Sequence, residues 1–340
     1  MKPYDHLTRE GQIRRVRRLA EQALSHYDLD VISISPIQHF LNTVFRVDAR
    51  PIGNGARDVE RYALRVHKPV GQGTTRIASE LAWTAALRRE LGVVVPEPVA
   101  ARDGSLIVEA DAVGVPGPRP CVLFRWVHGR FLGRSLSVAA MESVGEFMAR
   151  LHTHSETFQP TEGFNRPKWD IDGLFGAAVG LDADKAFAVL SAEERGVINR
   201  TADVVRRAQE QLGESRQVFG MIHGDFHQGN YLFHRGEVRA IDFDFCGWGH
   251  YAYDIGVCFS AGQRHLEYPA LREAFLRSYR RLRALSPEEE SLLDTFAAAF
   301  RMGHAMWLSA RLDDPAFSGR AREWVTQRIG QLESFLESSP

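Results

Sequence analysis

The spacing of apolar residues changes near residues 124 to 130 of this 340-residue chain. Before that point, strand-like runs over 42–49 and 61–67 flank a turn rich in Gly, Asn and Asp, which predicts a hairpin. After it, apolar residues recur with the helical period, for example over 192–212. A strand-rich segment followed by a mainly helical one predicts an α+β fold in two lobes.

Further elements are expected on both sides of this change. They are helices over 8–27 and 79–91 and strands over 105–109, 121–127, 231–233 and 238–244. The last hundred residues predict mainly helix.

Acidic and basic residues are balanced, with 42 Lys and Arg against 43 Asp and Glu, and a net charge of −1. This balance lacks the basic excess of a nucleic-acid-binding protein, so no nucleic-acid partner is expected. Arg14, Arg15, Arg17 and Arg18 cluster near the N-terminus. We interpret them as the solvated face of a helix.

The cysteines Cys121, Cys246 and Cys258 show no C-x-x-C spacing. They therefore argue against a disulfide framework and a structural zinc site. No apolar run is long enough to cross a bilayer, and the N-terminus has no apolar signal region. The sequence thus predicts a cytoplasmic protein without a membrane partner.

The stretch HGDFHQGN, residues 223–230, concentrates histidine, aspartate and asparagine side chains and admits three interpretations. His223 and Asp225 have the spacing of a two-histidine, one-carboxylate iron site. Such a site needs a β-rich barrel, whereas the downstream sequence predicts helices. A polar loop with backbone-bonded histidines explains His227 and His234 individually, but it leaves the residues after the loop unexplained.

The third interpretation uses the wider spacing. His223, Asp225 and Asn230 have the spacing H-x-D-x4-N, and Asp242 lies in an I-D-F run beyond a predicted hairpin. Protein kinases have H-R-D-x-x-x-x-N followed by D-F-G, where one aspartate handles the acceptor hydroxyl. The asparagine and the second aspartate hold Mg²⁺ on the phosphates, because this cation prefers hard oxygen ligands. His223 would then brace the loop rather than bind metal.

A kinase also needs a cation on a strand and a helix carboxylate that positions it. Strand alternation places Ala63 and Arg65 on one face. On the next helix, Glu80 shares an apolar stripe with Trp83. A carboxylate on a buried face needs a partner, so an Arg65–Glu80 ion pair is expected. The alternative is an acid favoured only by the helix dipole.

The run HGDFHQGN…IDFDFCGWGHYAYDIG resembles the aminoglycoside-phosphotransferase-like kinases. Their pattern is H-G-D-x-H-x-x-N, then I-D-x-[DE], then a small-residue turn and D-[IL]. The resemblance covers the chain from about residue 30 to its end and implies a two-lobed protein-kinase-like fold. The sequence predicts an N-terminal helix over 1–29, and the resemblance implies a small nucleotide-binding lobe over 30–124, a hinge over 125–130 and a helical catalytic lobe over 131–340.

The resemblance also implies ATP and Mg²⁺ as cofactors and a role for individual residues. Asp225 is expected to be the catalytic base, Asn230 and Asp242 the magnesium ligands, and His223 and Asp254 the structural supports of the loop. The nucleotide is expected to contact Ala63, Arg65, Glu80, Phe124 and Trp126, with a hinge strand over 122–127 and a covering loop over 39–47.

Two positions depart from the protein-kinase pattern. Arg65 stands where a lysine is usual, and it offers a planar fork rather than a point charge. Asp244 replaces the glycine of D-F-G, and it is expected either at the metal or facing the substrate. Trp248 is expected beside the acceptor.

The sequence predicts an ATP- and Mg²⁺-dependent phosphotransferase with a hydroxyl acceptor. The acceptor is either a protein Ser/Thr side chain or a small molecule such as an aminoglycoside, choline, homoserine or a sugar. Asp244, Trp248, Tyr251 and Tyr253 would suit a cationic acceptor, whereas Arg301, His304 and Arg311 would not.

The tail over 300–317 is similar to that of the bacterial stress-response Ser/Thr kinases, which slightly favours a protein acceptor. Its alternative interpretation is a helix that ends at an Asp-Pro turn, with Trp307 and Phe317 in the core. A catalytically silent nucleotide-binding protein is a further alternative. It would be marked by loss of Asp225, Asn230 or Asp242, and all three are present.

Overall fold

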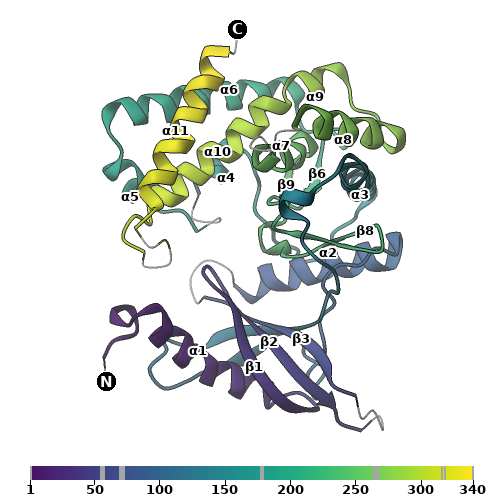
Figure 1. Cartoon of the computed structure of the whole chain (residues 1–340), viewed down its shortest axis with the longest axis vertical. Helices are drawn as coiled ribbons and strands as arrows, with labels where there is room; N and C mark the ends of the chain where they lie inside the picture. The colour runs from purple at the N-terminus through teal and green to yellow at the C-terminus, as the bar shows by residue number, and fades with distance from the viewer. Residues whose placement is uncertain are drawn as a thin grey trace. The chain divides into compact units, whose positions relative to one another are not determined.

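The computed structural model describes residues 2–53, 58–68, 73–176, 180–262, 268–314, 317 and 319–338 (Figure 1). The chain forms two compact units. The first contains Met1–Ala82, Pro96–Val127 and Asp314–Ser318, and the second contains Trp83–Val95, His128–Asp313 and Gly319–Pro340. Parts of the predicted turn over 50–58 and of the predicted loop over 71–75 lie outside the described residues.

The first unit is built on one antiparallel sheet with the strand order β1-β2-β3-β5-β4. Its elements are η1 (Tyr4–His6), α1 (Arg9–Leu24), β1 (Leu29–His39), β2 (Thr43–Pro51), β3 (Glu60–Val66), the first half of α2 (Thr74–Leu91), β4 (Val108–Ala110) and β5 (Arg119–Arg125). The predicted hairpin of 42–49 and 61–67 corresponds to the antiparallel pair β2–β3.

Alternation along the strands divides the apolar side chains of this sheet between two faces. Tyr62 and Leu64 of β3 join a core with Val16 and Leu19 of α1. Figure 1 shows α1 lying along the sheet. Ala63 belongs instead to a second cluster that includes Ile77, Leu81, Val122 and Phe124. The expected placement of Ala63 and Arg65 on one face therefore follows from the period of two.

The sequence analysis did not predict strand β1. It is an edge strand, its register shifts on both sides of Ser33–Pro36, and only Ile34 and His39 are buried. Because one proline and two irregularities interrupt the alternation, the strand has a weak sequence signal. Helix α2 also begins at Thr74, earlier than the expected 79.

The second unit is mainly helical. Its helices are the second half of α2, α3 (Val138–Thr157), α4 (Ile171–Leu174), α5 (Ala183–Val189), α6 (Ala192–Leu212), α7 (Tyr251–Gly262), α8 (Tyr268–Leu282), α9 (Pro287–Ser291), α10 (Leu293–Ser309) and α11 (Ala321–Ser338). Short elements complete it: η2 (Gly133–Ser135), β6 (Phe219–Ile222), β7 (Tyr231–His234), β8 (Glu237–Ala240), η4 (Phe243–Phe245) and β9 (Gly247–His250). The predicted α+β architecture, with a β-rich and a mainly helical part, is confirmed.

Two short sheets position the 223–230 loop in the second unit. Strand β6 pairs with β9, and β7 pairs with β8. The predicted strand over 238–244 is wrong beyond Ala240, because Asp242 has a φ of 61° and a 3-10 turn begins at Phe243. A left-handed residue cannot continue a strand.

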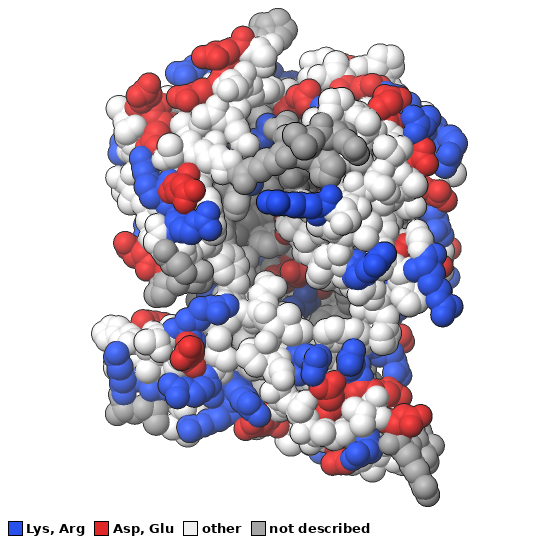
Figure 2. Space-filling view, in the orientation of Figure 1, with Lys and Arg blue, Asp and Glu red and all other residues white. Residues whose placement is uncertain are grey.

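The surface of the helical unit, on the face that Figure 2 displays, carries acidic and basic side chains interspersed. The three cysteines are buried free thiols. None of the helices in the described ranges combines the length and the apolar character that a bilayer crossing requires.

Close packing of α3 on α8 leads to a stability prediction. A Cβ at Gly145 would lie 2.4 Å from the Phe275 carbonyl oxygen. A Cβ at Gly330 would face open space. We expect Gly145→Ala to lower the free energy of unfolding by about 1–3 kcal/mol, because backbone cannot yield easily. Gly330→Ala in α11 is the matched control, and it should raise stability by about 0.5–1 kcal/mol. Urea denaturation measures both, and equal midpoints would contradict the close α3–α8 contact.

Candidate active site

The 223–230 loop is anchored by the carboxylate of Asp254 in α7. Asp254 Oδ2 accepts from the backbone N–H of His223 at 2.7 Å, and Oδ1 accepts from the N–H of Gly224 at 2.8 Å. Gly224 has a φ of 79°, and a Cβ there would lie 2.4 Å from the Phe245 carbonyl oxygen. The loop conformation therefore requires both the carboxylate and the glycine.

His223 connects this loop to the segment that contains Asp242. Its Nε2 donates to the Ile241 carbonyl at 3.1 Å, and its Nδ1 accepts from the Asp225 N–H at 3.4 Å. Burial lowers the pKa of His223, so the ring is neutral with its proton on Nε2. The ring braces two backbone segments through both nitrogens.

Asp225 and Asn230 are in direct contact. The Asn230 Nδ2 donates to Asp225 Oδ2 at 2.8 Å and to the Asp225 carbonyl at 2.9 Å. The amide oxygen of Asn230 is the atom that a cation would use. The Ile241 N–H donates to the Asn230 carbonyl at 2.8 Å, which brings Asp242 next in the chain to the same place.

Asp242 has the backbone conformation φ 61°, ψ 63°. A non-glycine residue in this left-handed region costs about 1–3 kcal/mol, and such residues cluster at functional sites. The strand-to-turn change at Asp242 redirects the chain after β8. Together, Asp225, Asn230 and Asp242 present oxygen atoms suited to a hydroxyl and a hard cation.

His227 has the loop-bonded position that the sequence predicts, and it also lies beside Asp225, which the sequence analysis did not predict. Its Nδ1 accepts from the Gly229 N–H at 3.0 Å, and its Nε2 lies 3.5 Å from Asp225 Oδ1. Burial acts to lower the pKa of His227, but the Asp225 carboxylate outweighs it, so the pKa is raised. The H-x-x-N spacing of His227 and Asn230 was the sequence signal that could have placed His227 near Asp225.

The first unit contains the expected ion pair of strand and helix. Arg65 Nη2 lies 2.8 Å from both carboxylate oxygens of Glu80, and the two residues are 5% and 2% exposed. The guanidinium also stacks over the Phe124 ring at 5.0 Å, and its Nε lies 3.2 Å from His67 Nε2. Glu80 therefore fixes the position of a buried cation, which the helix dipole alone would not do.

Of the two expected nucleotide-contacting residues of the hinge strand, Phe124 lies in β5 and Trp126 follows its last residue. Phe124 pairs with Ala63 across the sheet and is 6% exposed. Trp126 is half-buried, and its N–H donates to the Arg61 carbonyl at 3.3 Å. The turn between β1 and β2, within the expected covering segment 39–47, is closed by a bond from the Phe40 N–H to the Asn42 carbonyl at 2.9 Å.

Two tyrosines that the sequence offers to a cationic acceptor belong to the core. Tyr251 is fully buried beneath the Arg283 guanidinium, 4.4 Å from its ring centroid. Tyr253 is buried and stacks on Trp169 at 5.5 Å. That suggestion is wrong for these residues, because a helix that begins at Tyr251 turns both rings inward.

Asp244 and Trp248 have different environments. Asp244 is 6% exposed in η4, where its backbone carbonyl accepts a bond from Arg166. Trp248 is half-buried in β9, with the Arg216 guanidinium 5.7 Å from its ring centroid. A cation already occupies one side of this ring.

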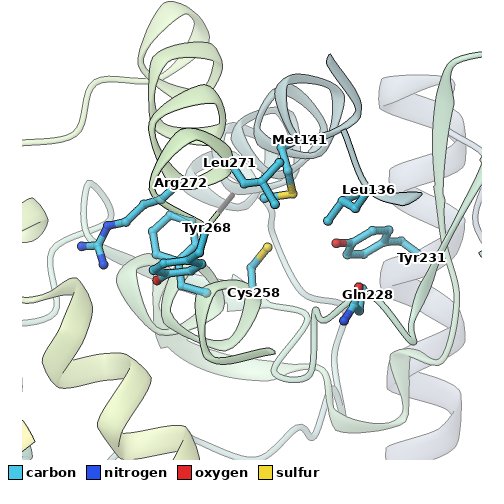
Figure 3. Close-up of a pocket in the computed structure, with 9 residues that line it drawn as sticks. Leu136, Met141, Gln228, Tyr231, Cys258, Tyr268, Leu271 and Arg272 are labelled. Atoms are coloured by element: carbon cyan, nitrogen blue, oxygen red, sulfur yellow. The ribbon is translucent and has the colours of Figure 1, made fainter. Parts of the chain in front are cut away.

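A small cavity borders the loop at Gln228 (Figure 3). It encloses about 20 Å³, and Leu136, Met141, Tyr231 and Cys258 are among its lining residues. This is room for a single water and far below the volume of a ligand pocket. The cavity is therefore not the place for an acceptor molecule.

No three His, Cys, Asp or Glu side chains converge as metal ligands within the described ranges. This arrangement gives no support to the two-histidine, one-carboxylate iron site. A kinase-type magnesium site does not need such a cluster, because phosphate oxygens and an asparagine supply ligands.

Comparisons with known proteins show the family and the fold of the chain. The sequence pattern of the family described as "Phosphotransferase enzyme family" matches residues 33–290. A homoserine kinase of Neisseria meningitidis serogroup B is 28% identical over 261 residues, which cover 74% of this chain and 76% of the relative.

Solved structures show the same fold over nearly the full chain. A microcompartment-associated aminopropanol kinase superposes with a TM-score of 0.80 and 28% identity, covering 95% of this chain and 98% of that one. An amicoumacin kinase solved with AMP-PNP, Ca²⁺ and Ami has a TM-score of 0.77 and 18% identity, covering 94% and 93%. The second likeness shows the fold alone.

The buried Arg65–Glu80 pair gives a prediction about stability. Glu80→Gln removes the negative charge and leaves a buried guanidinium unbalanced, which should lower the free energy of unfolding by about 3 kcal/mol. Glu90→Gln on the same helix is the control. That side chain is 45% exposed, so its replacement should change the free energy of unfolding far less. Urea denaturation compares the two, and equal effects would argue against a buried charge pair.

Proposed function

This chain belongs to the phosphotransferase enzyme family, and we propose that it transfers the γ-phosphate of ATP to the hydroxyl group of a small-molecule acceptor. The observation that carries the proposal is the contact of Asn230 with Asp225, together with the backbone bond that places Asp242 beside them. These three side chains supply the two functions that phosphoryl transfer needs from a catalytic loop.

Asp225 acts on the acceptor in this proposal. Its carboxylate accepts or orients the proton of the attacking hydroxyl, and the two Asn230 bonds fix its direction. Asn230 and Asp242 bind Mg²⁺, which draws the phosphate oxygens together and offsets their charge. His223 and Asp254 keep the loop in place without touching a reactant.

Arg65 binds nucleotide phosphates in this proposal. Its guanidinium is always charged, and the bond to Glu80 keeps it in one orientation. Ala63 and Phe124 pair across the sheet and offer an apolar surface for a base, with Trp126 following along the chain. Family membership and the presence of AMP-PNP in the amicoumacin kinase structure support ATP as the donor.

A small-molecule acceptor is favoured over a protein one. The related kinases named above act on homoserine, aminopropanol or amicoumacin by name. The aromatic residues of the tail over 300–317, whose sequence favours a protein acceptor, make packing contacts within the fold. Trp307 stacks beneath the Arg311 guanidinium at 4.2 Å, and Phe317 packs edge-on against Phe40 at 5.0 Å. These packing contacts explain the aromatic residues of the tail, so they are weak support for a protein substrate.

The acceptor class is tested with labelled ATP and Mg²⁺. The wild-type protein is incubated alone, with a generic protein substrate, and with amino alcohols, hydroxy amino acids, choline, sugars and aminoglycosides. We expect label on one small-molecule group and none on protein. Label on the chain itself or on the protein substrate would favour the stress-response type and contradict the proposal.

Asp225→Asn should slow phosphate transfer strongly while nucleotide binding survives. The carboxylate serves the acceptor, so we expect kcat to fall about 10²- to 10⁴-fold. The dissociation constant of Mg-ATP, measured by calorimetry, should change little. Asp203→Asn, on an exposed turn of α6, is the control and should keep full activity. Near-normal turnover in Asp225→Asn would disprove its assignment as the base.

Asn230→Ala and Asp242→Ala should affect one shared cation site. Each single variant should raise the Mg²⁺ concentration needed for half-maximal activity. The double variant should lose less than the sum of the two losses in free energy, because one cation is removed only once. Magnesium titrations of the three variants provide the measurement. Strict additivity would mean that the two side chains act on separate sites.

A further inference from the structure

The imidazole ring of His227 is held across the turn of the 223–230 loop. Its Nδ1 accepts from the Gly229 N–H at 3.0 Å, and the His227 carbonyl accepts from the Asn230 N–H at 2.7 Å. A Cβ at Gly229 would lie 2.7 Å from His227 Cε1, so a larger residue at that position would displace the ring. The backbone of the turn therefore fixes the direction of the ring.

This geometry determines which ring nitrogen presents a proton to Asp225. Because Nδ1 accepts a backbone N–H, the neutral ring carries its proton on Nε2. A charged ring also has a proton on Nε2, so this donor is present in either charge state. Nε2 lies 3.5 Å from Asp225 Oδ1. An N–H group of the loop is thus placed beside the carboxylate of the expected base.

The two carboxylate oxygens of Asp225 have different neighbours. Oδ2 accepts a bond from Asn230 Nδ2 at 2.8 Å. Oδ1 accepts no hydrogen bond from the described residues, and His227 Nε2 lies near it. The Asn230 bonds fix the direction of the side chain, but a bond on one oxygen restrains the carboxylate plane weakly, because the terminal torsion of aspartate is broad. A donor on Oδ1 would fix that plane.

We propose that His227 is a positioning residue for Asp225, and that its Nε2–H donates to Oδ1 when Mg-ATP and the acceptor are bound. The inference rests on the proposed function and adds a residue to it. A distance of 3.5 Å is long for a hydrogen bond, but such contacts at catalytic sites often tighten once the reactants are bound. Oδ1 keeps a second lone pair for the hydroxyl proton, and the fixed plane directs that lone pair at the acceptor. His227 itself takes no proton in this role.

Two substitutions separate the roles of the two ring nitrogens. His227→Gln places a side-chain amide within reach of the Nε2 position, whereas His227→Asn places one near Nδ1 only. Transfer from Mg-ATP is measured to whichever of 1-aminopropan-2-ol, L-homoserine, choline, glucose and kanamycin the wild type phosphorylates fastest. We expect His227→Asn to lower kcat about 10- to 100-fold, because the base is misplaced. The KM values for acceptor and Mg-ATP should change less than about threefold, and His227→Gln should keep kcat within about threefold of wild type.

A double variant shows whether His227 acts through Asp225. In the Asp225→Asn background, His227→Asn should lower kcat by less than about threefold more, because the carboxylate that it positions is already gone. A further loss as large as that in the wild-type background would mean that His227 acts independently of Asp225, which contradicts the inference. His234→Gln is the matched control, because this histidine follows the same loop in β7 and should keep wild-type kcat.

The outcomes separate this inference from the function beneath it. An active His227→Asn with an impaired His227→Gln would mean that the bond from Gly229 matters and that the role is structural. Loss of Mg-ATP binding in His227→Asn would mean the same. If both variants are equally impaired, the double variant decides. Each of these results against His227 leaves the proposed function intact, whereas failure of the wild type to phosphorylate any small molecule, with Mg-ATP still bound, would overturn both.

Discussion

The carboxylate of Asp254 is the contact on which the catalytic loop depends. It is 1% exposed and accepts backbone N–H bonds from two successive residues, His223 and Gly224. His152 of α3 adds a third donor through Nε2 at 3.4 Å. A buried carboxylate is tolerated only when such donors replace water. Because the bonds go to the backbone, they determine the path of the loop itself and hence the direction of Asp225.

The anchor continues away from the loop through side chains of α3 and α8. Tyr279 donates its hydroxyl proton to His152 Nδ1 at 2.8 Å, and Arg283 donates to the Tyr279 oxygen at 3.2 Å. Burial lowers the pKa of His152, which keeps the ring neutral and lets it accept on one side and donate on the other. In this series of hydrogen bonds, each group donates toward Asp254, so that the bonds polarise and strengthen one another. The same helices are in close contact at Gly145.

The first unit also contains buried charges that need partners, in this case the pair of Arg65 and Glu80. Arg65 and Glu80 are both withdrawn from water, and each would be unfavourable alone. The pair makes the position of the cation definite, which a flexible exposed lysine would not provide. Desolvation thus has the same consequence in both units. Each buried charge is stable only in a fixed arrangement with its partners. That arrangement positions the loop of Asp225 in one unit and the Arg65 guanidinium in the other.

The sequence by itself determined the catalytic spacing and the faces on which Arg65 and Glu80 lie. The faces rest on local geometry, because side chains alternate every two residues along a strand and recur every 3.6 residues along a helix. The tertiary structure alone decided that Tyr251 and Tyr253 are core, that Asp254 meets His152, 102 residues away, and that Arg328 meets His304. No period links residues of different helices. Which faces meet depends on how all the apolar surfaces pack together, and that is a property of the whole chain.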